Sequence, residues 1–299
     1  TTTLASLVTA PVDDLLVAIG RLADLLDAQP AGQLVGIHLE GPFLSADRCG
    51  AQNPRYMIDP DAAVTRALLD AGRGWVRMVT IAPERPGALD LVSTLVAEGV
   101  VAAVGHTDAD HEQVAAAIEA GATVATHLGN GMRPFHHREP GPIGTCLADP
   151  RIACELIVDG HHLHPGTVRL AAAAKGSDGI ILITDATSAA GAGDGTHRLG
   201  HLDIEVRDGV ARLAGHDTLA GSTLTMDAAL RNAVAAGLSL ADASRASSSV
   251  PARVLRLAER TGSITVGRAA DLVVLDGDLS VTAVMARGEP IVGHDLLTG

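Results

Sequence analysis

The hydrophobic residues of this chain fall into short runs that alternate with longer amphipathic stretches. Seven runs are rich in Val, Ile, Leu and Ala and are bounded by polar residues or glycine, which is typical of buried strands. They cover Thr3–Val8, Leu34–Glu40, Val76–Ile81, Val100–His106, Thr123–His127, Ala153–Asp159 and Ile180–Asp185. Apolar residues at helical spacing occupy most of the intervals, so the pattern predicts repeated β-α units around a parallel sheet.

The intervals between the strands predict amphipathic helices. The first spans about residues 12–26, where Leu15, Leu16, Ile19 and Leu22 share one face. Further helices are expected at 62–71, 87–98, 111–120 and 165–174.

After Asp185 the pattern changes. Residues 198–213 alternate in polarity around Asp208-Gly209, a dipeptide that favours a tight hairpin turn. Helices are expected at 223–236 and 240–257, and residues 270–292 return to short β-runs broken by Gly and Pro. The two β-rich pieces are expected to belong to a small accessory sandwich.

These elements predict an α/β fold: a (β/α)8 TIM-like barrel whose first strand is missing from this chain, with a small partial β-sandwich. A closed barrel of this kind needs eight strands. The pattern supplies seven, and the chain opens directly on one of them, so we expect that Thr1 is not the natural start. An open seven-stranded sheet is the alternative. The expected parts are the barrel with its catalytic site at 1–195, a β-hairpin at 196–219, the final barrel helices at 220–264 and a C-terminal β-segment at 265–299.

Composition narrows the class of protein. Residues are 47% hydrophobic but only 1% aromatic, so the core must be filled by aliphatic side chains, as in the interior of a parallel barrel. A net charge of −13 without a basic cluster argues against nucleic acid or an anionic membrane surface as partner.

Targeting and redox signals are lacking in the sequence. No apolar run reaches the roughly 18 residues of a membrane span, and TTTLASLVTA lacks the basic start of a secretion signal. The three cysteines form no CxxC pair, which argues against a disulfide framework or a zinc ribbon. We therefore expect a cytoplasmic protein.

Candidate chemistry is found where the predicted strands end. Four apolar strands finish on Glu40, His106, His127 and Asp185, each a residue that can bind a metal or move a proton. The carboxyl ends of barrel strands meet at one rim, where active sites are built. An unpaired charge there would cost several kcal/mol unless something binds it.

The four residues suit metal-assisted hydrolysis. Two imidazoles and a carboxylate are a ligand set for Zn²⁺ or a related divalent ion. Such an ion makes water a nucleophile near neutral pH, and Asp185 is placed to accept the water proton and pass it to a leaving group.

Other polar residues near the rim leave alternatives open. Arg138 follows His127 and offers a bidentate grip on a phosphate or carboxylate, the alternative being a surface arginine paired with Glu139. His38 points to the same face as Glu40 and is expected to be a hydrogen-bonded core histidine. One of three histidines past another strand end is expected to face the pocket: His161, His162 or His164.

The motifs of the chain resemble, in order, those of the N-acetylglucosamine-6-phosphate deacetylases, which are amidohydrolase-superfamily enzymes. The segments that carry the resemblance are HLEGPFL, GHTDA, THLGNGM, HHREPG, VDGHHLHP, ITDAT, LAGS and GSITVGRAADLVVLD. The resemblance runs from Thr1 to about Gly293. HLEGP together with HHREPG is fairly specific to this family.

The resemblance implies a role for each matching position. It implies Glu40, His106 and His127 as metal ligands, Asp185 as catalytic acid/base, and His162 as the histidine that holds the substrate and polarises its amide. It further implies substrate contacts from Ala51, Asn130, Gly131, Arg138, Leu219, Ala220 and Gly221.

The reaction so implied is hydrolysis of N-acetylglucosamine 6-phosphate to glucosamine 6-phosphate and acetate by a homodimer, with a substrate contact from the other subunit. The implied cofactor is one or two divalent ions per subunit: zinc, or alternatively iron, manganese, cobalt or cadmium. The family's first strand often carries a His-x-His pair for a second ion, and that strand is absent here. The chain also reads THLGNGM where the family usually has THLFNAM.

Two alternatives and one exclusion complete the prediction. The alternatives are deacetylation of another amino sugar or amide, and a metal-free sugar-phosphate-binding fragment. Related enzymes bridge two metals with a carboxylated lysine at a strand end. The single lysine here, Lys175, follows a helix, so that bridging chemistry is excluded.

Overall fold

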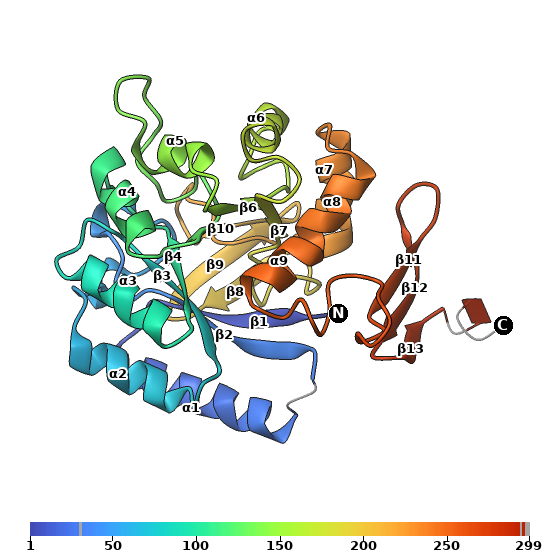
Figure 1. The fold of residues 1–299 in the computed structure, drawn as a ribbon, viewed down its shortest axis with the longest axis horizontal. Helices are drawn as coiled ribbons and strands as arrows, with labels where there is room; N and C mark the ends of the chain where they lie inside the picture. Colours follow the sequence, from blue (N-terminus) through green and yellow to red (C-terminus); the bar gives the residue numbers. More distant parts are fainter. Residues whose placement is uncertain (30–31, 294, 297–299) are drawn as a thin grey trace.

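The computed structural model describes residues 1–29, 32–293 and 295–296. It contains a seven-stranded parallel sheet covered by helices, and two separate three-stranded antiparallel sheets (Figure 1). This arrangement confirms the α/β class. None of the helices in the described residues is long and apolar enough to cross a membrane.

The parallel sheet follows chain order from its first strand to its last, and every neighbouring pair is parallel. Its strands are β1 (Thr3–Val8), β2 (Leu34–Glu40), β3 (Val76–Ile81), β4 (Val101–Val104), β5 (Val124–Ala125), β6 (Ala153–Ile157) and β7 (Ile180–Ile183). All seven predicted strands are therefore present. The sheet is curved, and no ladder in the described residues joins β7 to β1 (Figure 1).

Helices connect these strands, and all but one of them lie close to their predicted positions. They are α1 (Val12–Ala28), α2 (Ala62–Ala71), α3 (Ala88–Ala97), α4 (His111–Glu119), α5 (Gly141–Ala148) and α6 (Pro165–Lys175). The sequence pattern did not predict α5, because two glycines and a proline within eight residues are typical of a loop. Burial of Cys146, with Ile143 and Leu147 packed against the core, stabilises the helix instead.

One helix predicted at 240–257 is two helices. α8 (Leu240–Ser247) and α9 (Ser249–Val254) meet at Ser248, whose φ of −135° and ψ of −75° are not helical. Pro251 explains the break, because it cannot donate a hydrogen bond to the carbonyl one turn earlier and its ring crowds that carbonyl. The preceding helix, α7 (Met226–Ala235), follows the parallel sheet.

The β-rich pieces form two antiparallel sheets. The first contains β8 (Gly195–Leu199), β9 (Leu202–Arg207) and β10 (Val210–Leu213). As predicted, Asp208-Gly209 forms the turn between β9 and β10, with both residues at positive φ as a type I′ turn requires. The second sheet contains β11 (Leu272–Leu275), β12 (Val281–Ala286) and β13 (Glu289–Val292).

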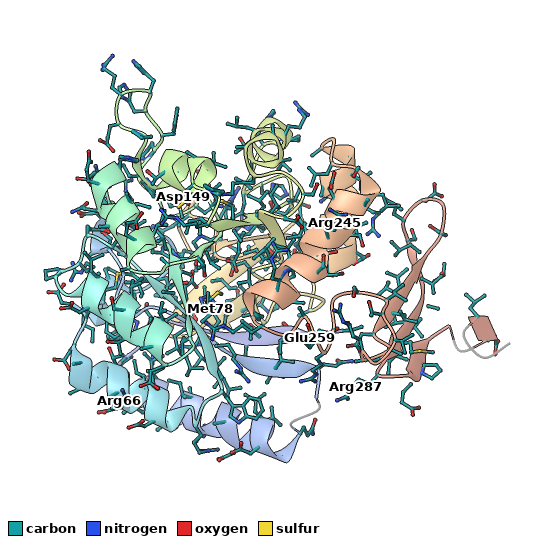
Figure 2. All side chains as sticks on the ribbon, viewed as in Figure 1. Arg66, Met78, Asp149, Arg245, Glu259 and Arg287 are labelled. Carbon is teal, nitrogen blue, oxygen red and sulfur yellow. The ribbon has the colours of Figure 1, made fainter. Side chains whose placement is uncertain are left out.

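Aliphatic side chains fill the space between the sheet and its helices, as the low aromatic content predicts (Figure 2). Among the described residues, Phe43 is the only aromatic side chain buried in the main core cluster, and the partly buried Trp75 packs against that cluster. Three polar side chains interrupt the apolar interior. They belong to His38 on β2, Thr80 on β3 and Thr126 directly after β5, and all three are buried. These polar side chains lie close to the candidate site.

Candidate metal centre and active site

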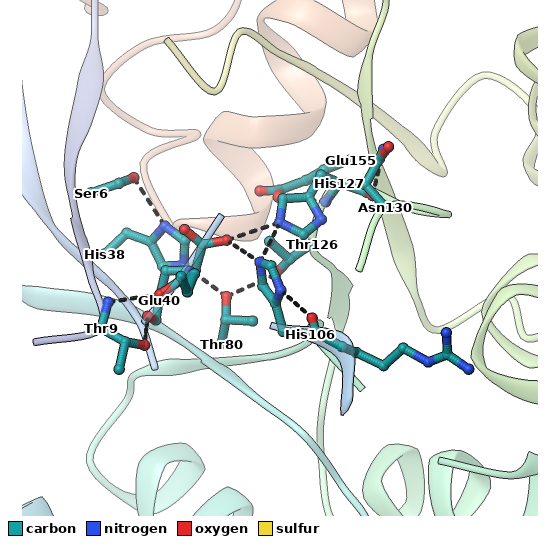
Figure 3. A network of polar contacts seen from close by, with 12 residues as sticks. Ser6, Thr9, His38, Glu40, Thr80, His106, Thr126, His127, Asn130 and Glu155 are labelled. Carbon is teal, nitrogen blue, oxygen red and sulfur yellow. Dashed lines mark hydrogen bonds and ion pairs between the residues drawn. The ribbon is translucent and has the colours of Figure 1, made fainter. Parts of the chain in front are cut away.

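Three predicted ligands from three parts of the chain converge on one point. Oε1 of Glu40 lies 2.9 Å from Nε2 of His106 and 2.8 Å from Nε2 of His127 (Figure 3). The two Nε2 atoms are 3.1 Å apart, and all three side chains are buried. The three side chains therefore converge as the sequence predicts.

The position of these residues relative to the strands corrects the sequence prediction. Glu40 is the last residue of β2, but His106, His127 and Asp185 do not end strands. Each lies two residues beyond a strand end, with φ of 45°, 30° and 48° respectively. Left-handed backbone turns these residues out of the ladder, so the polar side chains lie just past the sheet.

The three ligand atoms fit a divalent cation. Tetrahedral zinc with bonds of 2.0–2.1 Å places its ligand atoms about 3.3 Å apart. The separations of 2.8–3.1 Å between the three atoms are close to that spacing, and each residue offers one ligand atom to a common point. Two imidazole nitrogens with one carboxylate oxygen also match the chemistry of Zn²⁺ and related ions.

Charges in the cluster are strongly coupled. Burial opposes ionisation of Glu40, but hydrogen bonds from His106 and His127 outweigh it and hold the pKa of Glu40 well below its ordinary value. Burial also lowers the pKa of His127, yet the hydrogen bond and charge of Glu40, with Asp185 and Glu155, raise it to about 9. A metal ligand must be a neutral imidazole, so an ion bound here would displace that proton.

The second nitrogen of His106 fixes its ring. Nδ1 lies 2.8 Å from the carbonyl oxygen of Arg48, and a carbonyl only accepts, so Nδ1 carries the hydrogen. With an ion bound, Nε2 would face the ion as the ligand atom, which is the arrangement that a metal-binding histidine uses. Nδ1 of His127 is buried and has no hydrogen-bond partner among the described residues.

His38 is a hydrogen-bonded core histidine, as predicted. Its Nδ1 lies 3.0 Å from Oγ of Ser6 and its Nε2 lies 2.8 Å from Oγ1 of Thr80, which contacts Thr126 in turn (Figure 3). Burial lowers the pKa of His38 to about 4. Both ring nitrogens are occupied by hydroxyl groups, so His38 supports the cluster from beneath and is not a ligand.

Asp185 lies beside the side chains of Glu40, His106 and His127, and a backbone hydrogen bond holds it in place. Its carbonyl accepts a 2.8 Å hydrogen bond from the N–H of Ser222, which follows the predicted substrate-lining stretch. Burial raises the pKa of Asp185, and the nearby charge of Glu40 raises it further. A carboxyl group with a raised pKa can alternate between proton acceptor and proton donor near neutral pH.

Two of the three candidate histidines, His161 and His162, line one cavity, and His162 is also paired with Asp159. Asp159 accepts hydrogen bonds from the His162 N–H at 2.8 Å and from its Nδ1 at 2.7 Å. The pair lines a cavity of about 240 Å³, together with His161. His164 instead caps α6 by accepting from the N–H of Gly166.

Asp159 was not predicted as a site residue, although it was the last residue of the predicted strand Ala153–Asp159 and lies two residues past β6. Burial raises the pKa of Asp159, but hydrogen bonds from His162 and His161 outweigh burial and lower it to about 2. The signal was an aspartate three positions before the histidine in the DGHH segment. An ionised Asp159 fixes the His162 ring with Nδ1 as donor and Nε2 free.

The other predicted substrate contacts lie in several parts of the structure. Leu219 and Gly221 line the same cavity, while Ala51 and Ala220 belong to the small apolar cluster of the β8–β10 sheet. Asn130 donates from Nδ2 to the carbonyl of His127 at 3.1 Å.

Gly131 lies against His106. A Cβ built on Gly131 would be 2.7 Å from Nδ1 of His106, and its φ is +58°. In this structure, a larger residue at position 131 would force the His106 ring or the loop to shift.

Arg138 is not brought to the cluster within this chain. It is exposed in the loop between β5 and α5, and its Nη1 contacts Nε2 of His137 at 2.8 Å. The alternative pairing is not observed either, because Glu139 accepts from the N–H groups of His111 and Gly141. No contact of Arg138 with Glu40, His106 or His127 is seen among the described residues, and its role at the site stays a prediction.

Glu155 is a further charged residue that contacts His127. Glu155 is buried on β6 and accepts a long hydrogen bond, 3.4 Å, from the N–H of His127. Burial raises the pKa of Glu155 to about 7. The sequence pattern did not single out Glu155, although a charged residue within an apolar strand was the signal.

Lys175 is the last residue of α6 and donates to the carbonyls of Cys146 and Asp149 at the end of α5.

Comparison with known proteins supplies the evolutionary context. The model of the Amidohydrolase family matches residues 1–291. The N-acetylglucosamine-6-phosphate deacetylase of Bacillus subtilis (strain 168) is 42% identical over 257 residues, which are 86% of this chain and 65% of that protein. The N-acetylgalactosamine-6-phosphate deacetylase of Escherichia coli O157:H7 is 38% identical over 96% of this chain and 76% of its own length.

Solved structures agree with the sequence relatives. A mutant N-acetyl-D-glucosamine-6-phosphate deacetylase from Mycobacterium smegmatis, in complex with N-acetyl-D-glucosamine-6-phosphate, superimposes with a TM-score of 0.94 at 53% identity. That match covers 98% of this chain and 77% of the other. The deacetylase from Thermotoga maritima gives a TM-score of 0.91 at 36% identity, covering 97% and 78%.

The matches cover most of this chain but only part of each relative. The present chain spans 65% of the length of the Bacillus subtilis deacetylase and 66% of that of the N-acetylglucosamine-6-phosphate deacetylase of Lysinibacillus sphaericus, less than two thirds of each. The family model nevertheless matches nearly the whole chain, and the fold and the buried Glu-His-His cluster are consistent with it. The chain belongs to the amidohydrolase family.

Proposed function

We propose that this protein is a metal-dependent hydrolase that converts N-acetylglucosamine 6-phosphate to glucosamine 6-phosphate and acetate. The observation that carries the proposal is the convergence of Glu40, His106 and His127 on one point beside Asp185. Similarity to deacetylases of amino-sugar phosphates supports the substrate class.

Glu40, His106 and His127 would hold one divalent ion. Zinc suits two nitrogen ligands and one oxygen ligand best, with iron, manganese, cobalt and cadmium as the alternatives. When bound, the ion supplies Lewis acidity, which makes water a nucleophile near neutral pH. A second ion would need ligands beyond these three residues.

Asp185 moves the proton in the proposed reaction. Its carboxylate accepts a proton from the attacking water as the C–O bond to the acetamide carbon forms. It then donates that proton to the nitrogen, so that the C–N bond breaks and the amine leaves with acetate as the other product. The raised pKa of Asp185 favours both halves of this exchange.

His162 orients the amide from the cavity side. Asp159 fixes its ring through Nδ1, which leaves Nε2 to contact the substrate. Leu219, Ala220 and Gly221 would line the sugar, and the loop with Ala51 would close over it. This arrangement uses binding energy remote from the amide to place its carbonyl.

The phosphate would be held by backbone and by a cation. Gly131 would offer its backbone N–H and Asn130 its side-chain amide, because the backbone N–H of Asn130 already donates to the carbonyl of His127. Arg138 would offer a bidentate guanidinium. Because Arg138 is exposed and lies away from its own cluster, we propose that it serves the site of a second subunit in a homodimer.

We also propose how the barrel closes and how the chain divides into parts. We place an eighth strand between β7 and β1, which would close the curved sheet into a (β/α)8 barrel. The parts of the chain would then be the barrel at 1–195 and 220–264, and an accessory β-sandwich to which 196–219 and 265–299 contribute. We place the enzyme in the cytoplasm, in keeping with its three free cysteines.

Release of acetate from three substrates tests the activity. We expect turnover of N-acetylglucosamine 6-phosphate by the zinc-loaded protein, and much slower turnover of unphosphorylated N-acetylglucosamine, because the phosphate contacts lose their partner. N-acetylgalactosamine 6-phosphate tests the second candidate, supported by the Escherichia coli relative. No acetate from any of the three, in protein that carries zinc, would refute the proposed function.

A further inference from the structure

One carboxylate outside the ligand set joins the three loops that carry the ligands. We infer that Asp108 is a positioning residue of the candidate metal centre, acting through two arginines on the loops that follow Glu40 and His127. The inference rests on the proposed metal site and concerns only residues of this chain.

The first arm of this network reaches the loop after Glu40. Nε and Nη2 of Arg48 both lie 2.7 Å from Oδ1 of Asp108. Arg48 ends a short 3-10 helix, Ala46–Arg48, in a loop that has little other regular structure. Its side chain therefore anchors this loop to the segment that follows His106.

The second arm reaches the loop after His127. Nη2 of Arg133 donates to Oδ2 of Asp108 at 3.0 Å. Backbone bonds reinforce this contact: the N–H of Arg133 donates to the carbonyl of Thr107, and the N–H of Thr107 donates to the carbonyl of Gly131. Each oxygen of Asp108 thus holds a different loop.

The network ends on a metal ligand. The carbonyl of Arg48 accepts the 2.8 Å hydrogen bond from Nδ1 of His106 and so sets the rotation of the ring. Gly131 lies against the same ring, close enough that a Cβ would be 2.7 Å from Nδ1. A small shift of either loop therefore turns Nε2 of His106 away from Glu40.

Asp108 is itself held in place from behind. Its N–H donates to Oε1 of Glu84 at 2.6 Å, and Oγ1 of Thr107 donates to Oε2 of Glu84 at 2.5 Å. Glu84 lies in the loop after β3, so a fourth loop fixes the position of the carboxylate.

The exposure of the ion pairs separates positioning from stability. The side chains of Arg48 and Arg133 are each 33% exposed and that of Asp108 is 29% exposed. Ion pairs so open to water contribute little to folding. Partners that orient a metal ligand, by contrast, change metal affinity about 10- to 100-fold when they are removed.

The test is the zinc dissociation constant of Asp108→Asn, measured by competition with a chelator. We expect zinc binding about 10-fold weaker or more than in the wild type, with a nearly unchanged unfolding temperature of the metal-free protein. Asp149→Asn is the matched control. Asp149 also accepts a hydrogen bond from an arginine, Arg151, and its side chain is 20% exposed. It lies between α5 and β6 (Figure 2), before the amino end of that strand, whereas the candidate ligands lie at or past the carboxyl ends of their strands. Its zinc affinity should equal that of the wild type.

Variants of the arms show whether the effect runs through them. Arg48→Gln and Arg133→Gln should each weaken zinc binding less than Asp108→Asn does. Adding Arg48→Gln to Asp108→Asn should cost less affinity than it does in the wild type, because the contact is already lost. The absorption bands of bound Co²⁺, which report ligand geometry, should shift in Asp108→Asn and not in Asp149→Asn.

Each contrary outcome has a distinct meaning. Wild-type zinc affinity and Co²⁺ bands in folded Asp108→Asn would overturn the positioning role while leaving the metal centre intact. If Asp108→Asn does not fold, Arg48→Gln decides, and wild-type affinity in that variant overturns the inference. A wild-type protein that binds no zinc would refute the metal centre of the proposed function, and the inference with it.

Discussion

At the scale of single residues, three site residues share an unusual backbone. His106, His127 and Asp185 all have positive φ, which is uncommon outside glycine. Such conformations cost free energy and persist where surrounding contacts enforce them. The same turn recurs two residues after three different strands, so the strained positions coincide with the candidate chemistry.

Asp185→Asn isolates the role of that carboxyl group. Asparagine tolerates the left-handed region well, so the backbone at position 185 should stay in place. We expect kcat for acetate release to fall about 10²- to 10⁴-fold, the usual contribution of a general acid/base, with zinc content unchanged. Near-normal kcat in the variant would remove Asp185 from the proton-transfer step.

Asp159→Asn tests the dyad with His162 through stability. The pKa of Asp159 is lowered to about 2, so its ionised form stabilises the fold above about pH 4, and this contribution is lost as pH falls towards 2. The shift corresponds to about 2 kcal/mol in the free energy of unfolding. Urea titrations from pH 6 down to pH 2.5 should show the variant less stable at pH 6 and converging with the wild type in acid. A pH-independent difference would contradict the lowered pKa.

At the scale of elements, the strands and helices follow from the sequence because their patterns are local. The apolar runs predicted all seven parallel strands, and the Asp-Gly dipeptide predicted the β9–β10 turn. The helix α5 was missed because tertiary burial outweighs its poor helix composition. The break before α9 was missed although Pro251 signalled it.

The candidate site was predictable only in part, for a related reason. Candidate ligands that follow apolar runs can be predicted from one run at a time. Glu40, His106 and His127 were predicted in this way, although His106 and His127 lie two residues past their strands. Contacts between loops depend on how separate segments approach, which no local pattern encodes. The bond from His106 to the Arg48 carbonyl and the ties of Asp108 are contacts of that kind.

The segment around Gly221 offers an element-scale prediction. Its neighbour Ser222 pairs with the turn that carries Asp185, and a Cβ on Gly221 would lie 2.8 Å from the Asp185 carbonyl oxygen. Gly221→Ala should therefore lower kcat and destabilise the fold by more than the 1–2 kcal/mol of a left-handed alanine alone.

Gly215→Ala is the control for that change. Gly215 also has positive φ, at +76°, but nothing lies within 4 Å of its Cβ position. It should show the backbone cost and keep wild-type kcat. Equal unfolding free energies and equal kcat for the two variants would contradict a clamp on Asp185.

At the scale of the whole molecule, the exposed Arg138 poses the question of assembly. A site that is completed by a second copy should be restored by mixing two inactive variants. In a mixture of Arg138→Ala and Asp185→Asn, half of the dimers would be hybrids with one complete site each, giving about a quarter of the wild-type activity. Activity that stays at the level of the separate variants, in hybrids verified to form, would contradict a role across the interface.

The location of a bound ion tests the central claim most directly. Crystals of the protein grown with zinc should give an anomalous difference peak at the zinc edge. We expect that peak about 2.0–2.2 Å from a carboxylate oxygen of Glu40, from Nε2 of His106 and from Nε2 of His127. A zinc peak elsewhere, or none between these three side chains at saturating zinc, would contradict the account.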